Sequence, residues 1–223
     1  MELIASGLTR RFLRRSGESN AFEAVRPVDL TLRSREVTVL TGRSGSGKTT
    51  LLTMLAGLLT PSGGTVSLDS RDLYRLSDTD LSKLRAKYFA VIPQGASAIS
   101  SLTVMENILF PAALAGKKPP VREAEMIMER LGILPLRDVR PGELSGGELR
   151  RMAVTRALAG RPDFIFADEP TADLDDENTA LVLTLLREAA QSGVAVFVVT
   201  HEKDAAAYAD RLLHMDAGTL TNA

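Results

Sequence analysis

The segment that most constrains the fold of this chain is an eight-residue loop, Gly42-Arg43-Ser44-Gly45-Ser46-Gly47-Lys48-Thr49. It matches G-x-x-x-x-G-K-S/T, a loop whose backbone wraps around phosphate groups. The apolar run at residues 37–40 is typical of a buried strand, and the apolar residues 51–56 predict a helix that ends near Gly57. A strand, a glycine loop and a helix in this order are the context that the motif requires.

The residue types of this loop suit the binding of a nucleoside triphosphate. Gly45 and Gly47 let backbone N–H groups approach phosphate oxygens, and the helix that begins near Lys48 adds its positive end. Lys48 would reach the β- and γ-phosphates, and the Thr49 hydroxyl would take one position on Mg²⁺. The alternative is a Gly/Ser-rich connection that contains a lysine by chance. The expected binding residues are Gly42, Arg43, Ser44, Gly45, Ser46, Gly47, Lys48, Thr49 and Thr50.

Length and composition narrow the class of protein. A chain of 223 residues can bury a full core, and its 44% hydrophobic and 25% charged residues are ordinary for a globular protein. The formal net charge of -1 gives no basic field for nucleic acid, and the absence of cysteine excludes disulfides and thiolate metal sites. No signal peptide and no apolar stretch of membrane-spanning length is evident, so we expect a cytoplasmic protein.

Hydrophobic patterning predicts strands that alternate with helices. This order implies an α/β fold with a mainly parallel sheet and a ligand at the carboxyl ends of its strands. Further strands are expected at residues 3–5, 28–32, 65–68, 89–92, 164–167, 194–199 and 211–215. Further helices are expected at residues 77–87, 103–115, 121–131, 144–158, 181–186 and 203–209.

Two adjacent carboxylates, Asp168 and Glu169, follow the apolar strand at residues 164–167. Two carboxylates this close repel each other unless a cation lies between them, and each is then expected to have a separate role. The expected division gives Asp168 to Mg²⁺ and Glu169 to the attacking water, which it would orient and polarise. The alternative is a solvated acidic turn.

Polar residues also end two other predicted strands. Gln94 is suited to contact Mg²⁺ or the lytic water through its side-chain carbonyl, although glutamines after strands are common. His201 could donate to the γ-phosphate, while His214 inside the terminal strand is interpreted as structural.

A second anion site is expected where Leu144-Ser145-Gly146-Gly147-Glu148 opens a helix. Read locally, Ser145 is only an N-cap. Because one nucleotide cannot easily use two helix N-termini on separate lobes of one chain, this site favours a second chain.

The polar stretch at residues 10–20 contains Arg10, Arg11, Arg14 and Arg15 around Phe12. A solvated turn is one interpretation of this stretch. In the other, the Phe12 ring stacks on a nucleotide base.

Over essentially its whole length the sequence resembles the nucleotide-binding subunit of an ATP-binding cassette transporter. The resemblance is carried by the loop at 42–49, Gln94, the segment 144–148, the pair Asp168-Glu169, Ala172-Asp173-Leu174-Asp175 and His201, all in the family's order. The segment 144–148 is the diagnostic family signature, because other phosphate-loop enzymes lack it.

The resemblance implies a single domain, residues 1–223, with a P-loop NTPase core of the RecA-like type. Residues 1–94 and 161–223 would form this core together with an antiparallel β region, and residues 95–160 would form an inserted helical subdomain. An ATPase is implied in which Lys48, Gln94, Glu169 and His201 act in catalysis. Mg²⁺ would be held by Thr49, Gln94 and Asp168.

The resemblance also implies a dimer that encloses two ATP molecules. Ser145, Gly146, Gly147 and Glu148 would contact the ATP held by the partner's loop, and Asp175 would couple the two sites. In this family an aromatic residue under adenine stands at the position of Phe12, which favours the stacking interpretation.

The segment Leu102-Thr103-Val104-Met105-Glu106-Asn107-Ile108 most resembles the branch of lipoprotein-release and macrolide- or peptide-export systems. We therefore expect a cytoplasmic ATPase, peripheral on the inner face of the membrane, that drives a separate permease. The small residues 95–98 depart from the bulkier ones of the family at a loop that meets the permease, so the permease's identity stays open. Glu148 stands where glutamine is commoner in the family.

Three rival interpretations remain. An ATPase could regulate a membrane complex without transport, as in cell-division relatives of this branch. A DNA-repair or translation ATPase usually has coiled-coil insertions or tandem cassettes, which this chain lacks. A small-molecule kinase would leave the signature and His201 unexplained.

Overall fold

The computed structural model describes residues 1–13, 21–95, 97–202 and 204–222. Its strands are β1 (Glu2–Leu13), β2 (Ala21–Arg33), β3 (Val37–Thr41), β4 (Gly63–Leu68), β5 (Arg71–Asp72), β6 (Phe89–Ile92), β7 (Phe164–Asp168), β8 (Ala195–Val199), β9 (Arg211–Asp216) and β10 (Thr219–Asn222). Its α-helices are α1 (Lys48–Leu55), α2 (Asp78–Tyr88), α3 (Val104–Leu114), α4 (Val121–Arg130), α5 (Gly146–Ala159) and α6 (Asp176–Gln191).

A six-stranded sheet forms the centre of the molecule, in the order β10-β9-β3-β8-β7-β6. Strands β9, β3, β8, β7 and β6 run parallel, and β10 pairs antiparallel with β9 at one edge. The predicted α/β class with a mainly parallel sheet is therefore confirmed. The loop after β3 and the polar residues after β6, β7 and β8 all emerge at the carboxyl ends of parallel strands.

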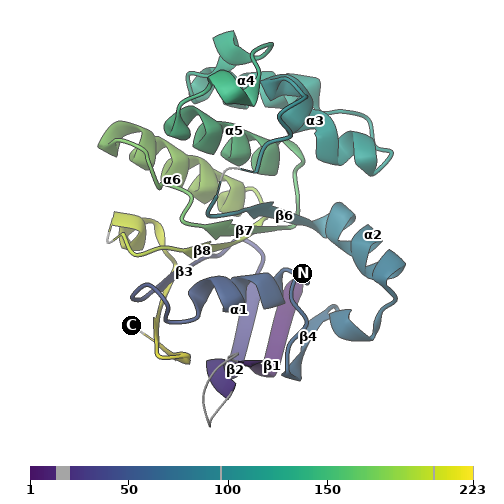
Figure 1. Ribbon diagram of the computed structural model, residues 1–223, viewed down its shortest axis with the longest axis vertical. Coiled ribbons are helices and arrows are strands. Elements are labelled where there is room, and N and C mark those ends of the chain that lie inside the picture. Colours follow the sequence, from purple (N-terminus) through teal and green to yellow (C-terminus); the bar gives the residue numbers. More distant parts are fainter. Residues whose placement is uncertain (14–20, 96, 203, 223) are drawn as a thin grey trace.

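Alternate residues of the buried strands face two separate cores. In β7, Phe164 and Phe166 pack with the side chains of α1, while Ile165 and Ala167 pack with those of α3 to α6. Because both faces of the strand are covered, its sequence is apolar throughout rather than alternating. Helix α1 thus covers one face of the sheet, and α5 and α6 cover the other (Figure 1).

A second, antiparallel sheet has the order β2-β1-β4-β5. Its apolar face packs on α1, which lies between the two sheets. In Figure 1 this sheet lies at the lower end of the molecule, and α3, α4 and α5 gather at the upper end. The three upper helices lie between β6 and β7 in the chain.

The predicted turn at residues 10–20 is wrong for its first four residues, because β1 continues to Leu13. Phe12 pairs with Phe22 across the β1–β2 ladder, and this cross-strand pairing extends the strand beyond the polar residues Arg10 and Arg11. The predicted positions Arg14 and Arg15 lie outside the described residues.

The carboxyl-terminal region differs from the prediction in two places. The expected helix at 203–209, of which residue 203 is outside the described residues, is a 3-10 helix at Asp204–Tyr208. The strand β10 was missed because its residues are mostly polar, but a tight turn at Ala217 and Gly218, both with positive φ, pairs it with β9. Within the described part of the chain, no helix has the length and apolar character needed to cross a membrane.

Candidate functional site

The backbone of the phosphate-type loop requires glycine at two points. A Cβ on Gly42 would lie 2.2 Å from the Met215 carbonyl oxygen, and a Cβ on Gly47 would lie 2.1 Å from the Ala24 carbonyl oxygen. Gly47 also has a φ of 106°, which L side chains rarely adopt. The backbone carbonyls of Met215 in β9 and Ala24 in β2 therefore fix the path of this loop.

The loop ends at the start of α1, where no side chain caps the helix. The first N–H groups of α1 are therefore available to an anion, at the positive end of the helix dipole. Lys48 is 7% exposed, and its Nζ donates to the carbonyl oxygens of Gly42 at 2.7 Å and Arg43 at 3.0 Å. The hydroxyl of Ser46 is buried without a hydrogen-bond partner among the described residues. This geometry suits a loop that closes around phosphate.

The side-chain oxygens of Asp168 and Thr49 lie together at the end of the loop. The Thr49 hydroxyl donates to the Asp168 carboxylate, yet Asp168 Oδ1 is buried with no hydrogen-bond partner in the described structure. Burial raises the pKa of Asp168, while the Thr49 hydrogen bond and Lys48 act in the opposite direction. A hydroxyl, a carboxylate and substrate phosphates are the oxygen donors that Mg²⁺ prefers, so these residues fit that ion.

Glu169 lies directly after β7, with a φ of 49°. Its side chain is held by the end of the neighbouring strand: Thr200 Oγ1 donates to Oε2 at 2.9 Å, and His201 Nδ1 lies 2.8 Å from Oε1. The left-handed backbone conformation turns the chain at this point, so Asp168 and Glu169 serve different partners although they are adjacent.

His201 is the exposed member of this pair, with 68% of its side chain accessible. The hydrogen bond to Glu169 raises the pKa of His201, and the carboxylate charges of Glu169 and Glu202 act in the same direction. The positive charge of Lys48 acts in the opposite direction. The imidazole faces solvent, where a phosphate group could reach it.

Gln94 lies two residues after β6, and its side chain is exposed. Its backbone carbonyl accepts a hydrogen bond from Arg150 of α5. The adjacent residues 97 and 98 are described, whereas Ala96 lies outside the described residues.

Ser145 is the N-cap of α5 and is exposed. Its hydroxyl and Glu148 form a capping box: Glu148 N donates to Ser145 Oγ at 3.3 Å, and Ser145 N donates to Glu148 Oε2 at 2.8 Å. Gly146 and Gly147 lie against Asp173, and a Cβ on Gly147 would come within 3.2 Å of the Asp173 carbonyl oxygen. Helices α5 and α1 cover opposite faces of the sheet, and among the described residues no hydrogen bond or ion pair joins this segment to the loop at residues 42–49.

Asp175 caps the next helix, α6, by accepting from Asn178 N at 2.8 Å and from Asn178 Nδ2. These hydrogen bonds lower the pKa of Asp175, which is exposed. The residue is thus a local N-cap with an ionised carboxylate on the surface.

Phe12 lies half-buried on β1, stacked on Phe22 at a centroid distance of 5.8 Å. The Arg10 guanidinium lies 4.6 Å from the centre of the Phe12 ring. Phe22 is two residues before Ala24, whose carbonyl contacts the glycine loop, so β2 connects the aromatic pair to the site.

Sequence reasoning missed several residues of the site. Thr200 orients Glu169, and Glu202 accepts a hydrogen bond from Thr171 at 2.6 Å. Arg150 is buried in α5 beside the carboxylates. A buried threonine at a strand end and an arginine inside an otherwise packed helix are weak signals, and only the tertiary structure gives them partners.

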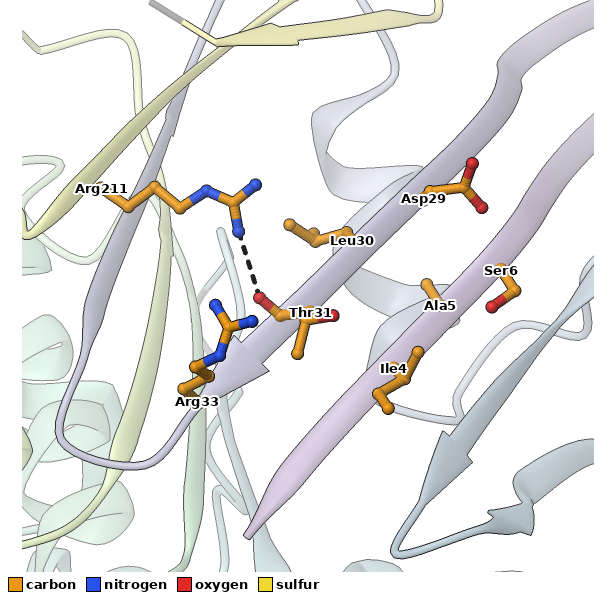
Figure 2. Close-up of a pocket in the computed structure, with 8 residues that line it drawn as sticks. All are labelled: Ile4, Ala5, Ser6, Asp29, Leu30, Thr31, Arg33 and Arg211. Carbon is orange, nitrogen blue, oxygen red and sulfur yellow. Dashed lines mark hydrogen bonds between the residues drawn. The ribbon is translucent and has the colours of Figure 1, made fainter.

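A separate hollow of about 500 Å³ lies where β1 and β2 approach β9 (Figure 2). Arg211 donates to the Thr31 carbonyl at 3.2 Å, Asp29 accepts from Gly7 N at 2.7 Å, and Arg33 pairs with Glu2. None of the predicted site residues lines it. The Arg211–Thr31 hydrogen bond connects the two sheets, the other two contacts join β1 to β2, and we interpret the hollow as structural.

Comparison with known proteins gives a consistent family. Residues 25–172 match the family model described as ABC transporter. The chain is 34% identical to the lipoprotein-releasing system ATP-binding protein LolD of Leptospira interrogans, over 100% of this chain and 94% of that protein. It is 36% identical to the macrolide export ATP-binding/permease protein MacB of Shewanella sp. (strain W3-18-1) and 37% identical to the probable syringafactin export protein SyfD of Pseudomonas syringae. Both matches include 98% of this chain. The chain spans only 34% of MacB and 33% of SyfD, which are longer proteins.

Solved structures agree with the sequence relatives. The dimeric structure of MJ0796, a bacterial ABC transporter cassette, matches with a TM-score of 0.90 and 27% identity, covering 99% of this chain and 98% of that one. A dimeric post-hydrolysis state of the same cassette, bound to ADP and Pi, matches with a TM-score of 0.89. Each similarity extends over nearly the whole chain, so it covers both the loop side and the signature side of the sheet.

Proposed function

The chain belongs to the ABC transporter family and is an ATP-hydrolysing subunit, and from this premise we propose that two copies enclose two ATP molecules and drive a separate membrane permease. The dimeric state of the similar cassette supports the assembly. In this proposal residues 1–94 and 161–223 form the nucleotide-binding core with its β region, and residues 95–160 form a helical subdomain. The chain then acts as a single domain.

The observation that carries the proposal is the convergence of Lys48, Asp168, Glu169 and His201. They come from α1 and from the carboxyl ends of β7 and β8, and Lys48 interacts electrostatically with both Asp168 and His201. The loop Gly42–Thr49 with Thr50 would bind the phosphates of ATP, and Phe12 would stack on adenine. Thr49, Asp168 and Gln94 would hold Mg²⁺, which when bound offsets the negative charge of the phosphates.

Glu169 is proposed as the general base. Its Oε atoms face Thr200 and His201, so the carboxylate is fixed rather than free to rotate. It would take a proton from the attacking water as the water oxygen bonds to the γ-phosphorus and the bond to the β-phosphate oxygen breaks. Lys48 and His201 would stabilise the charge that builds on the γ-phosphate oxygens.

The partner subunit supplies the other half of each site in this proposal. Ser145 and the exposed start of α5 offer a hydroxyl and helical N–H groups, with Gly146 and Gly147 allowing close approach. The partner's Ser145, Gly146, Gly147 and Glu148 would contact the γ-phosphate held by this chain's Lys48. Asp175 would lie near the dimer axis and couple the two sites.

A groove of about 800 Å³ is the proposed contact surface for the permease. It is formed by α2, β6, α3 and α5, and it exposes Leu58 (52%) and Leu114 (77%). The described lining residues include cations and no carboxylates, which suits an apolar segment with acidic residues. The cations are Lys83, Arg85, Lys87, Lys117 and Arg156.

The relatives named LolD and MacB support an exporter or extractor of the lipoprotein-release or macrolide- and peptide-efflux type. The permease would hold this chain at the inner face of the cell membrane. Substrate contacts would then lie in the permease, because the chain itself offers a nucleotide site and a docking groove.

The test uses Glu169→Gln, which keeps the shape of the side chain but removes the base. Steady-state ATP hydrolysis should fall by about 10²–10⁴-fold, the usual loss of general-base assistance. Light scattering should show a monomer without nucleotide, a dimer with ATP, and a monomer with ADP, which lacks the γ-phosphate that both chains contact.

Lys48→Ala is the matched control, because it removes a positive charge that would contact the phosphates and should weaken nucleotide binding and, with it, dimer formation. Activity of Glu169→Gln within a few-fold of the wild type would reject Glu169 as the base. A constant mass with ATP would reject the enclosed dimer.

A further inference from the structure

Arg150 is the one arginine that α5 buries to a few per cent of its accessible surface, with 7% exposed. Its Nη1 donates to the Pro93 carbonyl oxygen at 2.7 Å, and its Nη2 donates to the Gln94 carbonyl oxygen. One guanidinium thus binds two consecutive carbonyls at the end of β6. The planar guanidinium presents its donors in a fixed geometry, so the contact fixes direction as well as distance.

These two carbonyls have no place in the sheet. β6 ends at Ile92, so the backbone of Pro93 and Gln94 lies beyond the ladder that pairs β6 with β7. Pro93 also lacks an N–H group, which removes one way for the segment to hold itself. Arg150 therefore supplies the hydrogen bonds that set the path of the chain where the Gln94 side chain leaves it.

The surroundings of Arg150 connect it with the reaction site. Asp173, Asp168 and Glu169 all attract its charge, while burial lowers the pKa of its guanidinium. Burying a cation is costly unless it is hydrogen-bonded and paired, and an apolar side chain would satisfy the packing of α5 at lower cost. A charged side chain at this position is explained by the carbonyls and carboxylates it faces.

We propose that Arg150 is a positioning residue for ATP hydrolysis, whose guanidinium holds the backbone of Pro93 and Gln94 and thereby sets where the Gln94 side chain starts when it serves Mg²⁺ and the lytic water. This inference rests on the proposed role of Gln94. Arg150 does not touch the reacting atoms and acts through Gln94. Ser145 is the N-cap of the same helix, so Arg150 also connects the signature end of α5 to the Gln94 segment.

The test is a double-mutant cycle in the full chain, with kcat and KM for ATP measured in Mg²⁺. Arg150→Met should lower kcat by about 10- to 100-fold with KM nearly unchanged, since a displacement of about 1 Å at a reacting centre costs up to about 10²-fold. Arg150→Lys should recover part of kcat because one ammonium can still reach one carbonyl. Arg150→Met combined with Gln94→Ala should be no slower than the slower single variant.

Arg156→Met serves as the additivity control, because Arg156 lies on the same helix and donates to Ser97 instead of Gln94. Its effect should multiply with that of Gln94→Ala, as expected for sites that do not share a partner. If Arg150→Met multiplies in the same way, or if Gln94→Ala keeps the wild-type kcat, the inference is overturned.

Two measurements separate this failure from failure of the proposed function. Wild-type ATPase together with a slow Glu169→Gln variant establishes the function whatever the cycle shows, while a fully active Glu169→Gln variant contradicts the function itself. Thermal unfolding checks that each variant folds. If Arg150→Met does not fold, the cycle is run with Arg150→Lys, which keeps the buried charge, and the same non-additivity is required.

Discussion

At the scale of single residues, the space around a glycine of the loop decides how much stability is lost when alanine replaces it. Gly47 and Gly45 both have positive φ, at 106° and 77°, but their surroundings differ. A Cβ on Gly47 would overlap the Ala24 carbonyl oxygen, whereas a Cβ on Gly45 would meet nothing within 4 Å. The two positions separate the cost of backbone conformation from the cost of a steric clash.

Gly45→Ala should therefore lower the free energy of unfolding by about 1 kcal/mol, the usual cost of an alanine at positive φ. Gly47→Ala should lower it by about 3 kcal/mol or more, because the backbone must also move away from β2. Urea unfolding of the two variants beside the wild type measures both values. Equal losses would show that β2 does not press on the loop as the structure indicates.

The contact between His201 and Glu169 gives a prediction about pH. The hydrogen bond to Glu169 raises the pKa of His201, so the folded protein binds this proton more tightly than the unfolded chain does. The stabilisation is complete below the unfolded pKa of about 6.5 and is lost as the pH rises through the folded pKa.

In a chain with only two histidines, NMR titration can follow His201 after His214→Gln removes the other signal. We expect His201 to titrate above its ordinary range, and Glu169→Gln should lower its pKa. The stability difference between wild type and Glu169→Gln should be larger at pH 6 than at pH 8. An unchanged His201 titration in Glu169→Gln would contradict the contact.

At the scale of elements, the chain contains two helices that begin with the same device. Thr103 and Glu106 form a capping box at the start of α3, and Ser145 and Glu148 form one at the start of α5. The hydrogen bonds to the backbone are alike in both helices, and the Ser145 hydroxyl also donates to Glu148 Oε2 at 2.8 Å. A comparison therefore isolates what the α5 start does beyond backbone capping.

Ser145→Ala and Thr103→Ala should each lower the free energy of unfolding by about 1 kcal/mol, as loss of an N-cap side chain usually does. Only Ser145→Ala should also weaken ATP-dependent dimer formation in the Glu169→Gln background. Thermal unfolding measures the loss of stability, and light scattering on the same preparations measures dimer formation. A weakened dimer in Thr103→Ala as well would mean that helix stability, and not the Ser145 hydroxyl, limits assembly.

At the scale of the whole molecule, the sheet separates the loop that ends at Lys48 and Thr49 from the start of α5. Helix α1 covers one face and α5 the other, so the loop at Lys48 and the helix start at Ser145 belong to different layers (Figure 1). The arrangement favours a site completed by a second copy, and it gives a prediction that only mixed dimers can test.

Lys48→Ala and Ser145→Arg chains should each be inactive alone. In a mixture, a heterodimer has one composite site with both defects and one with neither, so partial ATPase activity should return. Lys48→Ala mixed with wild type measures whether a single intact site turns over. If that control is active and the mixture of variants stays inactive, Ser145 does not act on the partner's site.

The sequence by itself determined the features that depend on near neighbours in the chain. The glycine loop, the strand before it, the apolar strand ending in Asp168-Glu169 and the helix opening at Ser145 were all predicted as elements, because a local motif with its flanking hydrophobic pattern is sufficient to specify each. The resemblance carried by the signature was confirmed at the level of the family. Phe12 was placed in a possible turn because its pairing with Phe22 cannot be seen locally.

Only the tertiary structure decided which of these groups meet. Thr200 and His201 reach Glu169 across 31 and 32 residues, and Arg150 reaches Pro93 across 57. The β2 carbonyl that makes Gly47 indispensable lies on a strand before the loop, and β10 forms because β9 offers it an edge. Such contacts depend on how the sheet and helices pack, and no pattern of neighbouring residues encodes them, since a hydrogen bond between distant segments is specified by the fold that brings its two ends together.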